Sequence, residues 1–253
     1  MNLPRSLRAP SLALAAALAL AGAARADVTE TIVKTFPLAA DGTVSLDNVN
    51  GDIEIVAWDK AEVAIEAVKK ARDAEAMDAL RVHFDSEPGR LAIRTEYVKR
   101  SFRFKGDNRS VRYTLKVPAD ATLRKIDSVN SNITVEDVRG PVHLETVNGR
   151  IRASGLAADG DFDTVNGSIT ASFHSAAAAR KIVLDTVNGS CTLMLPADAG
   201  GRVKASSVNG SITCDIPVTL EKSGRRSLRG TIGRGDTEIV LDSVNGSLRI
   251  AGN

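Results

Sequence analysis

A short motif recurs along most of this chain and constrains its fold more than any other feature. The motif reads Ser or Thr, Val, Asn, Gly, one variable residue and then an aliphatic residue. From the second copy onward the central asparagines are separated by 18, 18, 22, 21 and 36 residues. Repeats with a period near 20 residues are typical of proteins that stack one small unit many times. The central asparagines of the seven copies are Asn50, Asn130, Asn148, Asn166, Asn188, Asn209 and Asn245.

The longest gap between copies, from Asn209 to Asn245, contains a degenerate copy of the motif. In the segment 228–232, Arg229 takes the asparagine position and Gly230 keeps the glycine position. With this copy included, we predict seven units of nearly constant length, stacked in sequence order from Asn130 to Asn245.

Each unit alternates apolar and polar residues on both sides of its Asn-Gly pair. This period of two, with many β-branched residues, predicts a strand, a corner and a second strand. The corner is expected at Asn-Gly because both residues tolerate a positive φ. For two units, the residues expected to face a core are Val142, Leu144, Ile151, Ala153, Phe162, Ile169 and Ala171, and those expected to face solvent are His143, Glu145, Arg150 and Arg152.

Two architectures agree with this pattern. Asn-Gly between alternating strands is also a strong hairpin signal, which would give an antiparallel meander or barrel. In a stacked coil, however, copies of the motif lie about 4.8 Å apart and form ladders of identical residues. Because the motif returns in the same frame, we favour a β-solenoid. The asparagines are then expected to form a structural column in which amides bond to each other; the alternative is a polar stripe that binds a ligand.

The region before the coil departs from the repeat. Residues 27–125 contain one motif copy, several strand-like segments and a helical pattern at 72–81. We expect a β-rich cap with one short helix, because an open solenoid end exposes strand edges. The predicted fold is therefore an all-β, single-stranded β-solenoid of about seven rungs (126–253) with this N-terminal cap.

The first 26 residues have the pattern of a secretory signal peptide. Arg5 and Arg8 precede an uncharged Ala/Leu run, and Ala24-Arg25-Ala26 has the small-x-small pattern of a cleavage site. No later stretch has the roughly 20 apolar residues that a membrane span requires. We expect an exported protein, periplasmic or on the cell surface. Its formal charge of +2 for 253 residues gives no field for binding nucleic acid.

The repeated Val-Asn-Gly units, and the ending that runs from Leu-Arg-Gly-Thr-Ile-Gly to Val-Asn-Gly-Ser-Leu, resemble the bacterial putative-adhesin β-strand-repeat family, a domain of unknown function. The resemblance covers roughly residues 36–251, with departures at Arg229 and at Ser131, where glycine is missing. It implies an exported β-solenoid and brings no catalytic residues. The leading hypothesis is an adhesin-like contact or scaffolding protein of the bacterial envelope.

Candidate catalytic and metal-binding groups are few. Asp159, Asp161 and Asp163 alternate as in a calcium loop, but the required glycine and closing glutamate are absent, which favours one solvated face. His83, His143 and His174 are spread too widely in sequence to suggest a metal site. We therefore expect no catalytic residue, metal or cofactor, although paired carboxylates on a coil face leave a glycan-cleaving enzyme as a weaker possibility.

The segment 94–125 carries the clearest local charge bias, with basic residues interleaved with aromatic ones. It predicts either an exposed edge protected by charge or a surface that contacts anions. The second option supports a rival function, an envelope-stress sensor or regulator that binds anionic lipid, glycan, peptide or a membrane regulator protein. The candidate anion contacts are Lys99, Arg100, Arg103, Lys105, Arg109 and Arg112.

The chain has two cysteines, and their positions in the repeat bear on whether they form a disulfide. Cys191 and Cys214 both lie an odd number of residues after their motif asparagine, so both should face inward. If rungs stack in sequence order, Cys191 lies beside Ile212 and Cys214 beside Leu193. Their Cα atoms would then be about 8 Å apart, beyond the limit of about 7 Å for a disulfide. We predict two buried free thiols.

Overall fold

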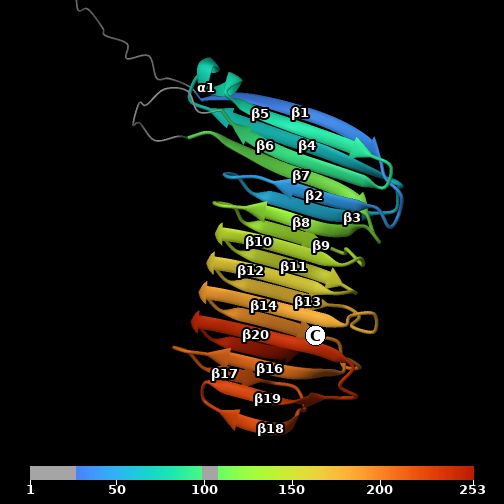
Figure 1. Cartoon of the computed structure of the whole chain (residues 1–253), viewed down its shortest axis with the longest axis vertical. Helices are drawn as coiled ribbons and strands as arrows, with labels where there is room; N and C mark the ends of the chain where they lie inside the picture. The colour runs from blue at the N-terminus through green and yellow to red at the C-terminus, as the bar shows by residue number, and fades with distance from the viewer. Residues whose placement is uncertain (1–26, 99–107) are drawn as a thin grey trace, which may run out of the picture.

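The computed structural model describes residues 27–98 and 108–253, which form two long β-sheets and one short helix (Figure 1). The ten-stranded sheet has the order β1 (Val28–Pro37), β4 (Glu62–Ala71), β7 (Ser110–Pro118), β3 (Ile53–Trp58), β9 (Ile133–Glu136), β11 (Ile151–Leu156), β13 (Ile169–Phe173), β15 (Cys191–Leu195), β21 (Leu248–Gly252) and β17 (Ile212–Cys214). The eleven-stranded sheet has the order β18 (Thr219–Gly224), β19 (Ser227–Ile232), β16 (Gly201–Ser207), β20 (Thr237–Asn245), β14 (Lys181–Asn188), β12 (Gly160–Asn166), β10 (Val142–Asn148), β8 (Thr122–Ser128), β2 (Thr43–Asp47), β6 (Arg90–Tyr97) and β5 (Leu80–Glu87). We call them the short-strand sheet and the corner sheet.

Parallel pairing of successive repeats distinguishes this fold from a chain of hairpins. β10, β12 and β14 pair in parallel in the corner sheet, with Asn148 opposite Asn166 and Asn166 opposite Asn188. β11, β13 and β15 pair in parallel in the other sheet. Each repeat contributes one strand to each sheet and turns at its Val-Asn-Gly corner. The structure is thus all-β and β-solenoid-like, as the motif frame predicted.

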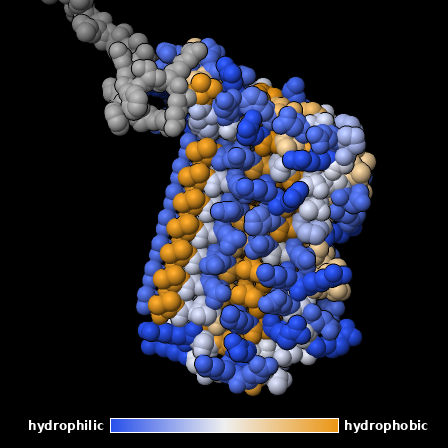
Figure 2. All heavy atoms as spheres, in the orientation of Figure 1, coloured by the Kyte–Doolittle hydropathy of each residue, from blue (hydrophilic) through white to orange (hydrophobic). Residues whose placement is uncertain are grey.

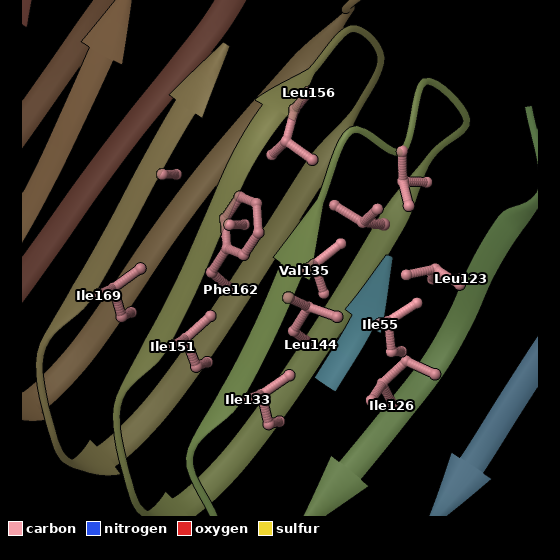
Figure 3. Packing of buried hydrophobic residues seen from close by; sticks show 14 of the residues in the cluster. Ile55, Leu123, Ile126, Ile133, Val135, Leu144, Ile151, Leu156, Phe162 and Ile169 are labelled. Carbon is pink, nitrogen blue, oxygen red and sulfur yellow. The ribbon is translucent and has the colours of Figure 1, made fainter. Parts of the chain in front are cut away.

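The core lies between the two sheets, and the alternation predicted it correctly. All seven residues expected to face inward are buried, with Ile169 fully inaccessible to solvent. Ile133, Ile151 and Ile169 occupy equivalent positions on neighbouring strands and stack in a line (Figure 3). Burial of such aliphatic side chains is worth about 1.5–3 kcal/mol each, so this column is a main source of stability.

The order of the last rungs differs from the prediction. β14 pairs with β20, and β20 pairs with β16, so the C-terminal repeat is inserted between two repeats that are consecutive in sequence. β15, β21 and β17 show the same order in the other sheet. The expectation of stacking in sequence order is therefore wrong for Asn209 and Asn245. Every copy carries the same motif, so the local sequence does not distinguish which copy should follow Asn188.

The prediction that the degenerate copy at Arg229 adds a rung to the stack is also wrong. The segment lies in β19, which pairs antiparallel with both β16 and β18. It forms a hairpin that covers the last rung instead of adding one. Arg229 lies opposite Lys204 and Lys222 and is not part of the stack of parallel corners.

Glycine at the corner serves close approach between rungs, not a positive φ. Of the motif glycines, only Gly51 has a positive φ, at 109°. A Cβ on Gly149, Gly167 or Gly189 would instead collide with the carbonyl oxygen of the neighbouring rung. The exception at Ser131 stacks near Gly51, and its hydroxyl bonds to that of Ser128.

At the N-terminal end of the stack the strands pair antiparallel. β1 pairs with β4, and β4 with β7, while β5 pairs with β6 at the end of the corner sheet. The predicted helix is a single short segment, α1 (Ala74–Asp78), where Asp73 accepts a hydrogen bond from the backbone N–H of Ala76.

β8 spans the proposed boundary between residues 125 and 126, and both sheets continue through it. Among residues 27–98 and 108–253, no helix is long and apolar enough to cross a membrane.

Both cysteines are free, as predicted, but not for the predicted reason. Cys191 lies opposite Leu248, and Leu248 lies opposite Ile212, so a whole rung separates the two cysteine strands. Cys191 is fully buried, whereas Cys214 is half-buried at the end of the short-strand sheet.

Candidate functional site: three columns along the solenoid

The seven motif asparagines lie in one exposed column at the corner. Along the stack the order is Asn50, Asn130, Asn148, Asn166, Asn188, Asn245 and Asn209, and from Asn130 onward each side-chain amide donates to the Oδ1 of the asparagine before it, at 2.8–2.9 Å. Each amide keeps a second N–H and a second lone pair. This asparagine column therefore stabilises the corner and still offers donors and acceptors to solvent.

Buried hydroxyls anchor the corner from inside. Thr146, Thr164 and Thr186 each donate to a backbone carbonyl of the neighbouring rung at 3.0–3.1 Å. Ser207 and Ser243 do the same at 2.9 and 3.2 Å. Each hydroxyl satisfies a carbonyl that would otherwise lack a partner, so the corner is rigid on both sides of the asparagine column.

A column of valines runs beside the asparagines. The valine before each motif asparagine points outward, and five of them are exposed by 38–56% of their surface. Figure 2 shows such a hydrophobic stripe along the long axis of the molecule. Single exposed valines are ordinary on protein surfaces, whereas a line of them that repeats along the stack is unusual. The exposed members of this valine column are Val129, Val165, Val187, Val208 and Val244.

A third column consists of carboxylates on the outer face of the corner sheet. Each of six rungs carries an acid three residues before its motif asparagine, and the strand pairing places these acids directly opposite one another. Sequence reasoning missed this column, although aligning the repeats would have revealed the constant acid. Its members are Asp47, Asp127, Glu145, Asp163, Asp185 and Asp242.

Mutual repulsion and partial burial perturb these acids. Desolvation, followed by the charges of Asp161 and Asp185, raises the pKa of Asp163 to about 6. Burial also raises the pKa values of Asp47 and Asp242. Neighbouring carboxylates about 4.8 Å apart repel one another when ionised, so a positive charge placed beside the column would favour their ionised form.

Among the described residues, the cations that act on this column lie toward its two ends. Lys125 forms a 2.8 Å ion pair with Asp127. Arg94 lies opposite Asp47, and the charge of Lys204 acts on Asp242. In the described part of the chain, the ion pairs place no lysine or arginine on Glu145, Asp163 or Asp185.

The structure brings His143 into this acidic surface, which its position in the sequence did not suggest. One of its ring nitrogens lies 3.2 Å from Asp161. Donor atoms of His143 lie within 4.8 Å of those of Asp161 and Asp163, and also of those of Asp127 and Glu145. Imidazole and carboxylate groups are donors that divalent metal ions take.

The other candidate acids and histidines have structural partners. Asp159 accepts hydrogen bonds from the backbone N–H groups of Arg180 and Lys181. His83 bonds to Glu96 at 2.8 Å, and a ring nitrogen of His174 lies 2.9 Å from the carbonyl of Gly155.

The predicted anion contacts fall mostly outside the described residues. Lys99, Arg100, Arg103 and Lys105 belong to residues 99–107, which the structure does not describe. Arg109 is partly buried: it donates to the carbonyls of Ala79 and Val98, and its guanidinium lies 5.4 Å from the centre of the Tyr97 ring. Arg112 is exposed on β7, opposite Val68.

These features define a class: an all-β, repeat-built solenoid whose corners carry one motif in register. Residues 119–251 match the Toastrack DUF4097 family model, and the chain belongs to this family, a domain of unknown function. The family resemblance stated from the motifs is therefore confirmed. No protein with a curated description matches the chain significantly.

Three solved structures are of interest for comparison, and one of them has a TM-score above 0.5. A putative cell adhesion protein from Clostridium sporogenes is 12% identical, with a TM-score of 0.55 over 89% of this chain and 100% of that chain. A putative adhesin from Bacteroides fragilis is 11% identical, with a TM-score of 0.41 over 87% of this chain and 97% of that one. A putative lipid binding protein from Parabacteroides distasonis is 15% identical, with a TM-score of 0.29 over 87% and 96%. The likeness to the Clostridium sporogenes protein shows a shared fold.

Proposed function

We propose that this protein is an exported, non-enzymatic contact or scaffolding protein of the bacterial envelope, adhesin-like in its mode of action. The observation that carries the proposal is the valine column, an exposed apolar line set between the asparagine and carboxylate columns. Contiguous apolar surface rimmed by polar groups is typical of sites that bind another macromolecule.

The stack suits such a role because it is rigid and repetitive. We propose a coil of about seven rungs, closed by the N-terminal β-rich region, that presents the same three side chains every 4.8 Å or so. Inter-amide bonds and buried hydroxyls hold the corner in one conformation before a partner binds. Binding therefore costs little further conformational entropy at this surface. A surface that repeats along the stack in this way favours an elongated partner over a small molecule.

Export remains part of the proposal. Residues 1–26, which carry the signal-peptide pattern, lie outside the described residues. Detection of a mature N-terminus at Asp27, in protein recovered from the periplasm or cell surface, is the expected result. Protein with residues 1–26 intact in the cytoplasm would contradict it.

The rival function, a regulator that binds anions through the segment 94–125, has less support. Arg109 is engaged by two backbone carbonyls and an aromatic ring, which leaves Arg112 as the exposed basic residue among the two described candidates. The comparison with a cell adhesion protein agrees better with a contact role, although that likeness concerns the fold.

Co-sedimentation with purified bacterial envelopes tests the proposal. Replacing Val165 and Val187 with Thr keeps the side-chain shape but removes apolar surface from the valine column. The matched control changes Val28 and Val33 to Thr on β1, where both are also exposed. We expect wild-type and control protein to sediment with envelopes and the column variant to lose most binding. No sedimentation of wild-type protein, or equal binding by both variants, would overturn the proposal.

The non-enzymatic part has its own test. Carboxylates on a coil face, one with a pKa of about 6, are groups that glycan cleavage could use. We expect no turnover when mature protein is incubated with polyuronides or peptidoglycan. Turnover that disappears in Glu145→Gln or Asp163→Asn would make the protein an enzyme.

A further inference from the structure

Among the described residues, no lysine or arginine forms an ion pair with the acids in the middle of the carboxylate column. Glu145, Asp163 and Asp185 lie on three successive rungs and pair directly across the strands. Lys125 pairs with Asp127 and its charge also acts on Glu145, while Lys204 acts on Asp242 at the other end. Aligning like charges in this way is destabilising. A partner that supplies positive charge here relieves the repulsion, which makes its binding more favourable.

Apolar surface runs parallel to this charge. On each corner-sheet strand the valine follows the acid by two residues, as Val165 follows Asp163 and Val187 follows Asp185. Alternate residues of a strand share a face and lie about 6.6 Å apart. The face therefore presents one acidic line and one apolar line, side by side over the six rungs from Asp47 to Asp242.

The spacing of these lines indicates the form of a matching partner. From Asp47 to Asp242 there are five intervals of about 4.8 Å, or about 24 Å in total. An α-helix covers that length with about 16 residues and repeats its side-chain rows every 5.4 Å or so. An extended strand repeats every 6.6 Å or so on one face and loses register with the rungs much sooner.

We propose that this face docks a cationic amphipathic helix of a partner protein or peptide, laid along the solenoid axis. Its lysine or arginine row lies over the carboxylate column, and its adjacent apolar row covers the valine column. The inference rests on the proposed contact function and names the chemistry of the partner. Anionic lipid headgroups would be repelled by the same surface.

Binding of a designed probe tests the inference. The probe is a labelled, amidated 16-residue peptide of Lys, Leu and Ala, with Lys on one helical row and Leu on the next; its control has Gln in place of each Lys. Fluorescence anisotropy at low salt should show binding of the Lys peptide and not of the Gln peptide. Affinity should fall as salt rises to physiological strength, because exposed charges are screened over about 8 Å.

Matched variants localise the binding. In Glu145→Gln/Asp185→Asn the column loses two charges, and affinity should fall about tenfold. The control, Glu54→Gln/Glu136→Gln, removes the same charge from exposed positions of the opposite sheet and should bind as wild type does. The double change of Val165 and Val187 to Thr should weaken binding without altering its salt dependence. Melting curves confirm that every variant is folded.

Three results would overturn the inference: no binding of the Lys peptide by wild-type protein, equal binding of the Gln peptide, or equal losses in both charge variants. Any of these, together with valine-dependent sedimentation with envelopes, would reject the cationic helix and leave the contact function standing. Binding of the Lys peptide without envelope sedimentation would support the cationic helix as the ligand of this face and reject the contact function at the envelope.

Discussion

Asn245 donates its side-chain N–H to Oδ1 of Asn188 at 2.8 Å, although 57 residues separate the two in sequence. Asn209, which follows Asn188 in sequence, bonds instead to Asn245 at 2.9 Å. The asparagine column is therefore continuous through an inserted rung. The amide ladder depends on the shape of the corner and not on the order in which the chain visits it.

Breaking this ladder should cost a measurable but small amount of stability. Asn188→Ala removes the amide that donates to Asn166 and accepts from Asn245. Because the side chain is exposed, we expect a loss of about 1–2 kcal/mol in the free energy of unfolding. Urea denaturation measures it. An unchanged midpoint would show that the interamide bonds add nothing beyond hydration.

A methyl group at the corner should be far more harmful. In Gly189→Ala the new Cβ would collide with the carbonyl oxygen of Gly167, so neighbouring rungs must separate. We expect a loss of several kcal/mol. Gly224→Ala is the control, since the nearest atom to its Cβ is 3.8 Å away. Similar melting temperatures for the two variants would contradict the close-approach explanation.

The inside–outside assignment is tested by introducing charge. Ile169 is fully buried between Ile151 and Cys191, so Ile169→Asp should destabilise the protein by several kcal/mol or prevent folding. Arg150 is exposed, and Arg150→Asp should shift the melting temperature little. Equal shifts would show that the two faces have been misassigned.

The raised pKa of Asp163 predicts a pH dependence of stability. An acid with a higher pKa in the folded state than in the unfolded chain destabilises the fold once it is ionised. Its penalty is therefore present at pH 7 and disappears as the pH falls from about 6 to about 4. Because Asp163 is partly exposed and screened, we expect Asp163→Asn to stabilise the protein by about 1 kcal/mol at pH 7. The gain should vanish near pH 4 in urea titrations; a gain that is equal at both pH values would exclude this cause.

The two thiols should react at different rates in the native protein. Burial raises the pKa of Cys191 to about 12 and also raises that of Cys214, which is half-buried. Maleimide should therefore label Cys214 slowly and Cys191 hardly at all, while both react after unfolding without reductant. Fewer than two reactive thiols in the unfolded protein would indicate a disulfide that the structure does not contain.

Alternation predicted the strands and their buried faces well, and the Asn-Gly pairs predicted where the corners lie but not the φ of their glycines. The period of two identified Ile151 and Ile169 as core residues and Arg150 as exposed, because burial on one face of a strand leaves a direct trace in sequence. The motif recurs with the same residues in the same order, which predicted parallel stacking because such stacking places identical residues beside each other, as with Asn148 and Asn166. A chain of hairpins would not require this identity.

The features that the sequence did not reveal depend on contacts between distant repeats. Interchangeable motifs do not encode which copy lies beside Asn188, and Arg229 matches the motif frame yet pairs antiparallel. The acid before each corner, such as Glu145, was visible, but its meaning as a column required the register of the stack. The role of Gly189 likewise depends on a carbonyl oxygen in another repeat.

The inserted rung has a consequence for how the protein is made. β20 and β21 leave the ribosome after β16 and β17, yet the earlier strands pack on the later ones. Until the later strands emerge, the open end formed by β14 and β15 can receive the wrong repeat, with Asn209 in the place of Asn245. Vectorial, rung-by-rung folding during synthesis or export therefore gives an incorrect order. The strands between residues 201 and 252 reach their native order only after residue 252 is available, so a segment made later becomes a layer between two segments made earlier.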